Sequence, residues 1–324
     1  METQPIRLHS HARGRADFRD PLVAPHRQLA RVILWMVGAL LSFCVMAVAI
    51  RKLWGALSIM EILALRSILG LTIVVVIAAV RPQLRQTVNT RRLGLHIVRN
   101  GIHFGSQYLW ALGVVLLPLA TVFALEFTMP AWTILLAPFF LGERMTESRI
   151  GAVVLGLLGV LIILRPGIES FQPAALLVLL AALGYGAQNI ATKKLTHTES
   201  TFAIVFWMNV IQLALALTFA GGPFFIGKLT PDLLPAVLGL GAAGLFAHFC
   251  LSNAFRAGDA SVVIPLDFMR IPLIAVIGWW LYNEPLDAFV FAGAGLIISG
   301  ILWNLHAEVR RPLPAAPAED VKAG

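Results

Sequence analysis

Apolar runs long enough to cross a lipid bilayer recur along the chain, with only short polar connections between them. A transmembrane helix needs about 20 mostly apolar residues. Short connections force consecutive helices to lie antiparallel to one another. We therefore predict an all-α membrane protein with ten transmembrane helices and no soluble domain between them. The predicted spans cover residues 30–50, 57–79, 95–115, 119–140, 149–165, 174–193, 202–221, 232–255, 260–282 and 287–305.

Composition supports a membrane location. Of the 324 residues, 58% are hydrophobic and 13% are charged, whereas a soluble domain carries about 25% charged residues. So few charges cannot cover a particle that faces water on all sides. The two cysteines, Cys44 and Cys250, lie inside apolar runs and have no disulfide or metal-ligand spacing. We expect no cofactor and no metal.

The distribution of lysine and arginine predicts the orientation. With a cytoplasmic N-terminus, 18 of the 25 basic residues fall on the cytoplasmic side and four on the outside, while Arg66, Arg99 and Arg270 lie in spans or at their edges. This bias places both termini in the cytoplasm, and we expect a multi-pass protein of the bacterial inner membrane. The net charge of +8 is thus explained without nucleic acid as a partner.

The two terminal segments differ from the apolar body. Residues 1–29 are polar and rich in arginine, with no apolar core that would mark a signal peptide, and residues 307–324 are rich in proline and charge. Both segments are predicted to be disordered cytoplasmic tails.

The two halves of the apolar body resemble each other at an offset of 141–142 residues. Five helices per half is an odd number, so the second half must insert upside down relative to the first. Inverted repeats are typical of transporters, because exchanging the conformations of two equivalent halves moves the opening from one side to the other. The matching residues are Arg51-Lys52-Leu53 with Lys193-Lys194-Leu195, Leu125-Glu126-Phe127 with Leu266-Asp267-Phe268, Leu141-Gly142-Glu143 with Tyr282-Asn283-Glu284, and Leu155, Gly159 and Leu161 with Leu296, Gly300 and Leu302.

The segment from Pro130 to Gly167 and its second copy from Pro265 to Asp287 carry a family resemblance. They resemble the EamA-type transporters of the drug/metabolite transporter superfamily. The resemblance implies five-helix repeats at 30–167 and 172–306, around a cavity lined by the third, fourth, eighth and ninth helices. It implies a secondary transporter, with export favoured, for an amino acid, a vitamin or an amphiphilic organic compound. Proton coupling and the choice between monomer and homodimer stay open.

Ionisable residues inside spans are the candidates for substrate binding or coupling, because each costs roughly 2.5–3.5 kcal/mol on insertion scales. Glu126 and Asp267 occupy equivalent repeat positions. They are predicted to bind a proton or a cationic substrate group, with Glu126 unpaired on its own helix. Arg270 lies one turn after Asp267. It either neutralises Asp267 in a static pair or receives a substrate carboxylate or phosphate.

A polar stripe follows the third predicted helix. Arg99, His103 and Trp110 recur at spacings of three and four together with Ser106, and Gln107 lies beside them. Within a span such a stripe is predicted to face a cavity. For Arg99 the alternative is that its side chain reaches the membrane interface.

Four further charged residues are predicted to form structural ion pairs or caps. Glu61 and Arg66 lie about 140° apart around one helix, so Arg66 is expected to meet a carboxylate on another helix. Glu143 and Glu284 lie at equivalent helix ends and are expected to cap helices or pair with loop groups.

Two other functions compete with transport. An intramembrane hydrolase could use Ser106 with His103 or His248, but no nucleophile-elbow or metalloprotease motif is present. A scaffold or sensor would not move a substrate at all. The absence of a phosphate-binding loop motif argues against direct use of ATP.

The orientation is testable with alkaline phosphatase fusions, which are active only outside the cytoplasm. Fusions at Pro118 or Gly222 should be active, and fusions at Gln86 or the C-terminus inactive, because of the charge bias across the predicted loops. An active fusion at the C-terminus would overturn the predicted orientation.

Overall fold

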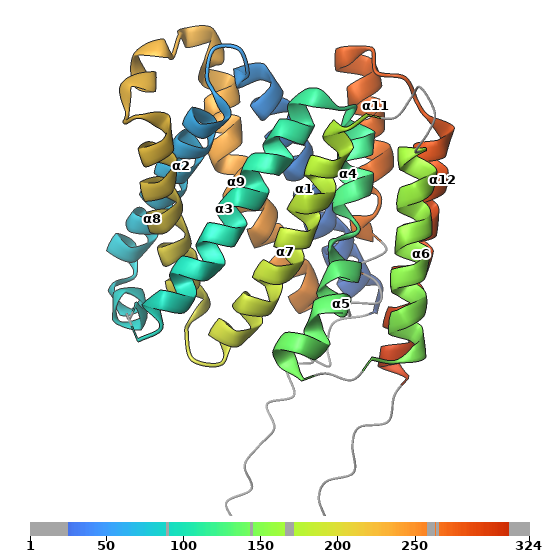
Figure 1. Cartoon of the computed structure of the whole chain (residues 1–324). Coiled ribbons are helices and arrows are strands. Elements are labelled where there is room, and N and C mark those ends of the chain that lie inside the picture. Colours follow the sequence, from blue (N-terminus) through green and yellow to red (C-terminus); the bar gives the residue numbers. More distant parts are fainter. Residues whose placement is uncertain are drawn as a thin grey trace, which may run out of the picture.

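A computed structural model describes residues 25–88, 91–142, 145–165, 172–257, 263 and 266–310, and these residues form helices and no β-strand. The helices pack as one bundle (Figure 1). In chain order they are α1 (Pro25–Leu53), α2 (Ile59–Val80), η1 (Pro82–Thr87), α3 (Leu93–Leu116), α4 (Leu119–Glu126), α5 (Met129–Leu141), α6 (Glu147–Leu164), α7 (Ala174–Thr196), α8 (Thr201–Ala220), η2 (Phe224–Lys228), η3 (Pro231–Leu233), α9 (Leu234–Ala257), α11 (Arg270–Tyr282) and α12 (Ala288–Val309).

The prediction of an all-helical membrane protein is confirmed. Within the described residues, eight helical segments are long and apolar enough to cross a bilayer. Helix α3 has 24 residues but carries the polar stripe and is not among them, and α11 has only 13 residues. The total of ten spans therefore stays a prediction.

Helix ends follow local sequence signals. Helix α2 begins with a capping box, in which the Ser58 hydroxyl accepts from the Glu61 amide and the Glu61 carboxylate accepts from the Ser58 amide. Helices α5 and α8 end at Gly142 and Gly221, whose positive φ angles suit glycine. At the chain ends, α1 begins at Pro25 and α12 continues to Val309, so both helices extend into the predicted tails. The apolar pattern predicts which part of a helix lies in the lipid, but the helix itself continues beyond that part.

The fourth predicted helix is broken into two pieces, and the ninth has a similar break. Helices α4 and α5 are separated by a turn at Phe127 and Thr128, and a turn at Phe268 and Met269 precedes α11. Pro130 and Pro272 each lack the amide that would donate to the carbonyl four residues earlier. Each break therefore interrupts the regular helical hydrogen bonds beside Glu126 or Asp267, although the Phe268 carbonyl still accepts from the Ile271 amide.

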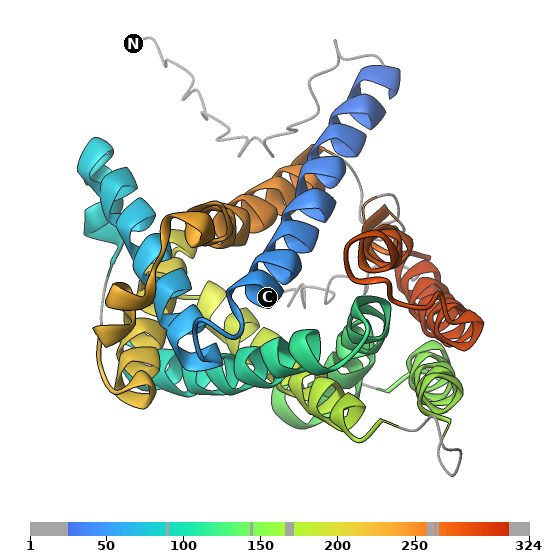
Figure 2. The ribbon, with the colours of Figure 1, turned by 90° about the horizontal axis from the view of Figure 1, so that it is seen from above.

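Helix packing follows the repeat. Helix α1 packs along α9, and the repeat-equivalent pair α7 and α3 packs in the same way. Helices α2 and α8, and α6 and α12, pair with their own equivalents, and α4 packs against α11, which is the equivalent of α5. Figure 2 shows these helices surrounding a common centre. This is the pattern that a two-fold relation between the halves would produce. In the α6–α12 pair, a side chain on Gly159 would lie 2.6 Å from the Gly293 carbonyl oxygen, so close contact there requires glycine.

Candidate functional site

Arg270, at the first turn of α11, is the most highly coordinated charge inside the bundle. Its side chain is only 6% exposed, and Nη2 donates to the Asp267 carboxylate at 2.5 Å. Nη1 lies 3.5 Å from the Glu126 carboxylate. The guanidinium also stacks on two rings, 4.0 Å from the centroid of Phe43 and 4.9 Å from that of Phe127. Cation–π contacts of this kind contribute about 2 kcal/mol or more when desolvated. Arg270 therefore joins α1, α4 and α11.

Glu126 ends α4, directly before the helix break. Besides its contact with Arg270, its carboxylate accepts a hydrogen bond of 2.8 Å from the Trp110 indole. Glu126 has no partner on its own helix, as expected, but it is not unpaired, because its partners come from α3 and α11. Next to these carboxylates, the rings of Phe127 and Phe268 pack at 4.9 Å between centroids, so the two helix breaks meet.

Arg66 on α2 binds amides instead of a carboxylate. Its Nη2 donates to Gln107 of α3 at 2.7 Å and to Gln212 of α8 at 2.8 Å. It forms no ion pair with any carboxylate of the described residues. The expected ion pair is therefore wrong, because the polar side chains that face the middle of α2 are amides. Glu126 and Asp267 already contact Arg270.

Other contacts connect Arg66 to the Arg270 group. The Gln212 amide lies 2.9 Å from Nδ1 of His103, whose ring packs edge-on against Tyr185 of α7. Tyr185 lies within electrostatic range of both Arg66 and Glu126. Together these residues form what we call the central polar cluster: Arg66, His103, Gln107, Trp110, Glu126, Tyr185, Gln212, Asp267 and Arg270.

Several side chains of the central polar cluster are partly exposed. The side chains of Glu126 and Asp267 are 20% and 18% exposed. Arg66, His103 and Tyr185 are half-buried. Carboxylates amid packed helices keep such exposure only where water or a ligand can reach them. The cluster is therefore not a fully packed core.

Arg99 lies further along the same face of α3, and the alternative that its side chain reaches the membrane interface is wrong. The residue is only 6% exposed, and its guanidinium donates to the Thr192 hydroxyl of α7 at 3.1 Å and to Asn100 at 2.6 Å. Because α3 packs along α7, the side chain finds partners within the protein. The α3 stripe therefore faces the bundle interior along its length.

A second charged group joins the helix ends opposite the start of α1 and the end of α12 (Figure 1). Arg51, in the last turn of α1, forms an ion pair with Glu284 and donates to the carbonyl oxygens of Val114 and Leu117 at the end of α3. Glu284 also accepts from the Leu119 amide at the start of α4, at 2.8 Å. We call this group the Arg51–Glu284 clamp. It connects α1, α3 and α4 to the end of α11.

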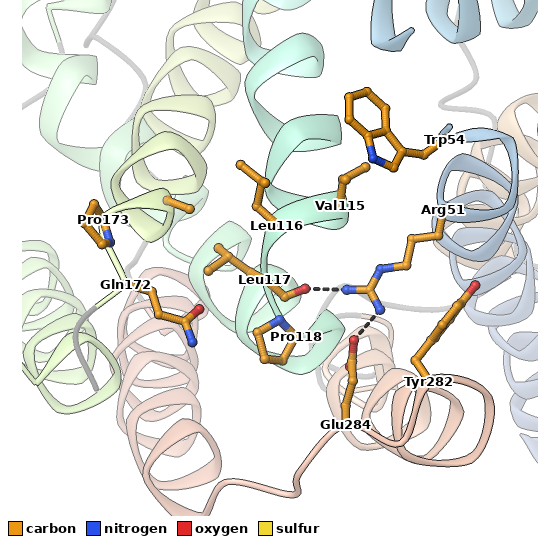
Figure 3. Close-up of a pocket in the computed structure, with 11 residues that line it drawn as sticks. Arg51, Trp54, Val115, Leu116, Leu117, Pro118, Gln172, Pro173, Tyr282 and Glu284 are labelled. Carbon is orange, nitrogen blue, oxygen red and sulfur yellow. Dashed lines mark hydrogen bonds and ion pairs between the residues drawn. The ribbon is translucent and has the colours of Figure 1, made fainter. Parts of the chain in front are cut away.

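Figure 3 shows the clamp at the side of an open hollow of about 680 Å³. Trp54, Pro118, Gln172 and Tyr282 are among its lining residues. The Arg51 and Glu284 side chains are only 12% and 13% exposed, although they lie at the ends of their helices. The clamp thus holds these helix ends together beside the hollow.

Two more ion pairs support the same end. Arg165 contacts Asp287, and Lys228 contacts Glu61 at 2.6 Å. Sequence reasoning proposed Glu61 and Glu284 for structural pairs but missed their partners, which are 167 and 233 residues away in the chain. It also missed Gln212, although a glutamine inside a span was a signal. Glu143 lies outside the described residues, as does the side chain of His248.

Ser106 and His103 do not form the hydrogen-bonded pair that a hydrolase would need. Its hydroxyl donates to the backbone carbonyl of Ile102 at 2.9 Å, while His103 contacts Gln212. Among the described residues, no group of three or more histidine, cysteine, aspartate or glutamate side chains is placed to hold a metal ion.

A multi-pass helical bundle with polar side chains inside is an architecture that membrane transporters use. The sequence profile of the EamA-like transporter family matches residues 30–165 and again residues 172–305. The chain therefore belongs to the EamA-like transporter family.

Several curated relatives are similar over about two thirds of the chain or more. A riboflavin transporter of Rhizobium johnstonii is 34% identical over 241 residues, which cover 68% of this chain and 76% of the relative. An S-adenosylmethionine uptake transporter of Rickettsia bellii is 29% identical over 69% of this chain and 76% of its own. A pseudopaline exporter of Pseudomonas aeruginosa is 25% identical over 82% of this chain and 93% of its own.

A solved structure shares the fold. It aligns with 87% of this chain and 99% of its own, with a TM-score of 0.56 and 18% sequence identity.

The contacts of Arg270 predict unequal effects of mutating its group. Arg270→Gln should destabilise the protein by about 3–5 kcal/mol, because two carboxylates lose their partner. Asp267→Asn should destabilise the protein less than Arg270→Gln does, because Arg270 keeps its contact with Glu126. The double mutant should be more stable than Arg270→Gln alone. Melting temperatures in detergent measure all three, and a wild-type melting temperature for Arg270→Gln would contradict the structural role.

Proposed function

We propose that the chain carries a small organic metabolite across the bacterial inner membrane by alternating access, with the central polar cluster as its substrate site. The observation that supports this most strongly is the placement of two arginines and two carboxylates inside the bundle. They lie where the two halves meet, beside broken helices and with accessible surface. Ionisable groups within a membrane are costly and usually mark a substrate or ion pathway.

Broken helices suit a binding site because they present unpaired backbone groups at mid-membrane depth. The α4–α5 break and the turn before α11 meet at Phe127 and Phe268. Both breaks sit next to a carboxylate. A substrate held there would contact both halves, so binding could bias their relative arrangement.

The Arg51–Glu284 clamp supports alternating access. It holds the ends of four helices together, including α11 of the second half, and this end would have to separate for a substrate to pass. We infer that the structure represents the state closed at the clamp. The charge bias of the sequence supports an orientation with this end outside and both termini in the cytoplasm.

The relatives narrow the substrate class without fixing it. Their names refer to riboflavin, S-adenosylmethionine and pseudopaline, and to both uptake and export. We propose a metabolite of similar size. Mass spectrometry of cells and medium, with and without overexpression, should reveal a metabolite whose distribution changes, and the sign of the change gives the direction. Proteoliposome counterflow of that metabolite, and of riboflavin and S-adenosylmethionine, then separates a transporter from a scaffold or sensor, which would show no flux.

We propose Glu126 as the group that couples transport to protons. It can exchange partners, because it shares Arg270 with Asp267 and has the longer of the two contacts, at 3.5 Å against 2.5 Å. Protonation would remove its attraction to Arg270 and leave the Asp267 pair in place. The binding site would then change its charge without losing its main structural contact.

Glu126→Gln should therefore fold and exchange substrate, but lose accumulation driven by a pH gradient in proteoliposomes. Glu147→Gln, which alters an exposed carboxylate in the first turn of α6, is the matched control and should behave like wild type. Unchanged accumulation and an unchanged pH profile in Glu126→Gln would exclude the coupling role.

A further inference from the structure

We propose that Arg66 binds an oxyanion group of the substrate, so that the transported metabolite carries a carboxylate or a phosphate. This inference rests on the proposed function of the central polar cluster and adds a chemical class to it. The sequence pattern favoured a structural ion pair for Arg66, whereas the contacts point to a ligand.

The first argument is the charge state of the partners. Arg66 is half-buried in the middle of α2, and its hydrogen-bond acceptors are the neutral amide oxygens of Gln107 and Gln212. A charge inside a membrane protein normally pairs with an opposite charge. Within the described part of the chain, the nearby carboxylates Glu126 and Asp267 contact Arg270 instead. The counter-charge for Arg66 is thus left for a ligand to supply.

The second argument is the unused donor capacity. Both amides accept from Nη2 of Arg66. Its Nε makes no hydrogen bond with the described residues, and none of their acceptors binds Nη1. A guanidinium matches the geometry of carboxylates and phosphates, which accept two hydrogen bonds at once. Arg66 therefore has donors available for an oxyanion.

The third argument is that the guanidinium is held in place. Gln212 is almost completely buried and also contacts His103, and Gln107 is 8% exposed. Two amides from two different helices thus fix Nη2 and orient the remaining donors. A preorganised arginine loses less conformational entropy when it binds a ligand. The amides thus position Arg66 without neutralising it.

The test supplies the missing charge from within the protein. Gln107→Glu replaces an amide that already contacts Arg66 with a carboxylate of nearly the same shape, so the new side chain should neutralise Arg66 and weaken its attraction for an anion. Gln83→Glu adds the same charge at an exposed position of η1 and is the matched control. Arg66→Gln removes the site itself. Arg66→Lys keeps the positive charge but loses the planar guanidinium that can donate two parallel hydrogen bonds.

The readout is the melting temperature of purified protein, titrated at constant ionic strength with benzoate, phenyl phosphate or the neutral analogue benzamide. Wild type and Gln83→Glu should be stabilised by benzoate or phenyl phosphate and not by benzamide. The more effective of the two anions distinguishes a carboxylate from a phosphate site. In Gln107→Glu the half-stabilising concentration should rise roughly 10- to 100-fold, as expected for losing charge-assisted hydrogen bonds.

Three outcomes would overturn the proposal: no stabilisation of wild type by either anion, equal stabilisation by benzamide, or a wild-type response in Gln107→Glu. Because Gln107→Glu keeps a partner for Arg66, it should fold even if Arg66→Gln does not. The melting-temperature assay does not depend on substrate transport. Anion binding without transport would refute the proposed function alone, and transport of a metabolite with no anionic group would refute this inference alone.

Discussion

The need to compensate charge inside a hydrocarbon environment is the constraint on which this structure depends. Arg270 meets that need with two carboxylates and stacked aromatic rings, and in doing so it ties α1 and α4 to α11. Arg51 meets it with Glu284 and two backbone carbonyls. Each arginine therefore holds elements of both halves together. A conformational change between the halves must either keep these contacts or exchange them for others of similar strength.

The two charged groups have different consequences for movement. The Arg270 group lies where the helix breaks meet and is held by several aromatic contacts. The Arg51–Glu284 clamp lies at one end and joins its helices through two side chains, Arg51 and Glu284. Loss of one ion pair would release several helix ends together. Arg66 differs from both, since amides hold it without neutralising it.

Much of the fold follows from the sequence because hydrophobic length and turn residues act locally. Most predicted spans overlap described helices, although the fourth is broken between α4 and α5 and part of the ninth lies outside the described residues. The α3 stripe faces the interior as its spacing predicts. Partners of charged residues were predicted less well. Arg66 was assigned a carboxylate and Glu126 none, because each meets side chains from helices remote in sequence. Periodicity on one helix shows which way a residue faces but not which residue of another helix it meets.

The central claim is alternating access controlled at the clamp, and a distance across the hollow tests it most directly. Spin labels at Trp54→Cys and Gln172→Cys lie at exposed positions on its lining (Figure 3), and the only other cysteines, Cys44 and Cys250, would be replaced by alanine. Pulsed electron–electron double resonance in lipid nanodiscs should give a main population with a short distance between the two labels and a minor population with a longer one. Arg51→Gln should shift the population toward the longer distance. A single distance distribution that Arg51→Gln leaves unchanged would contradict the account.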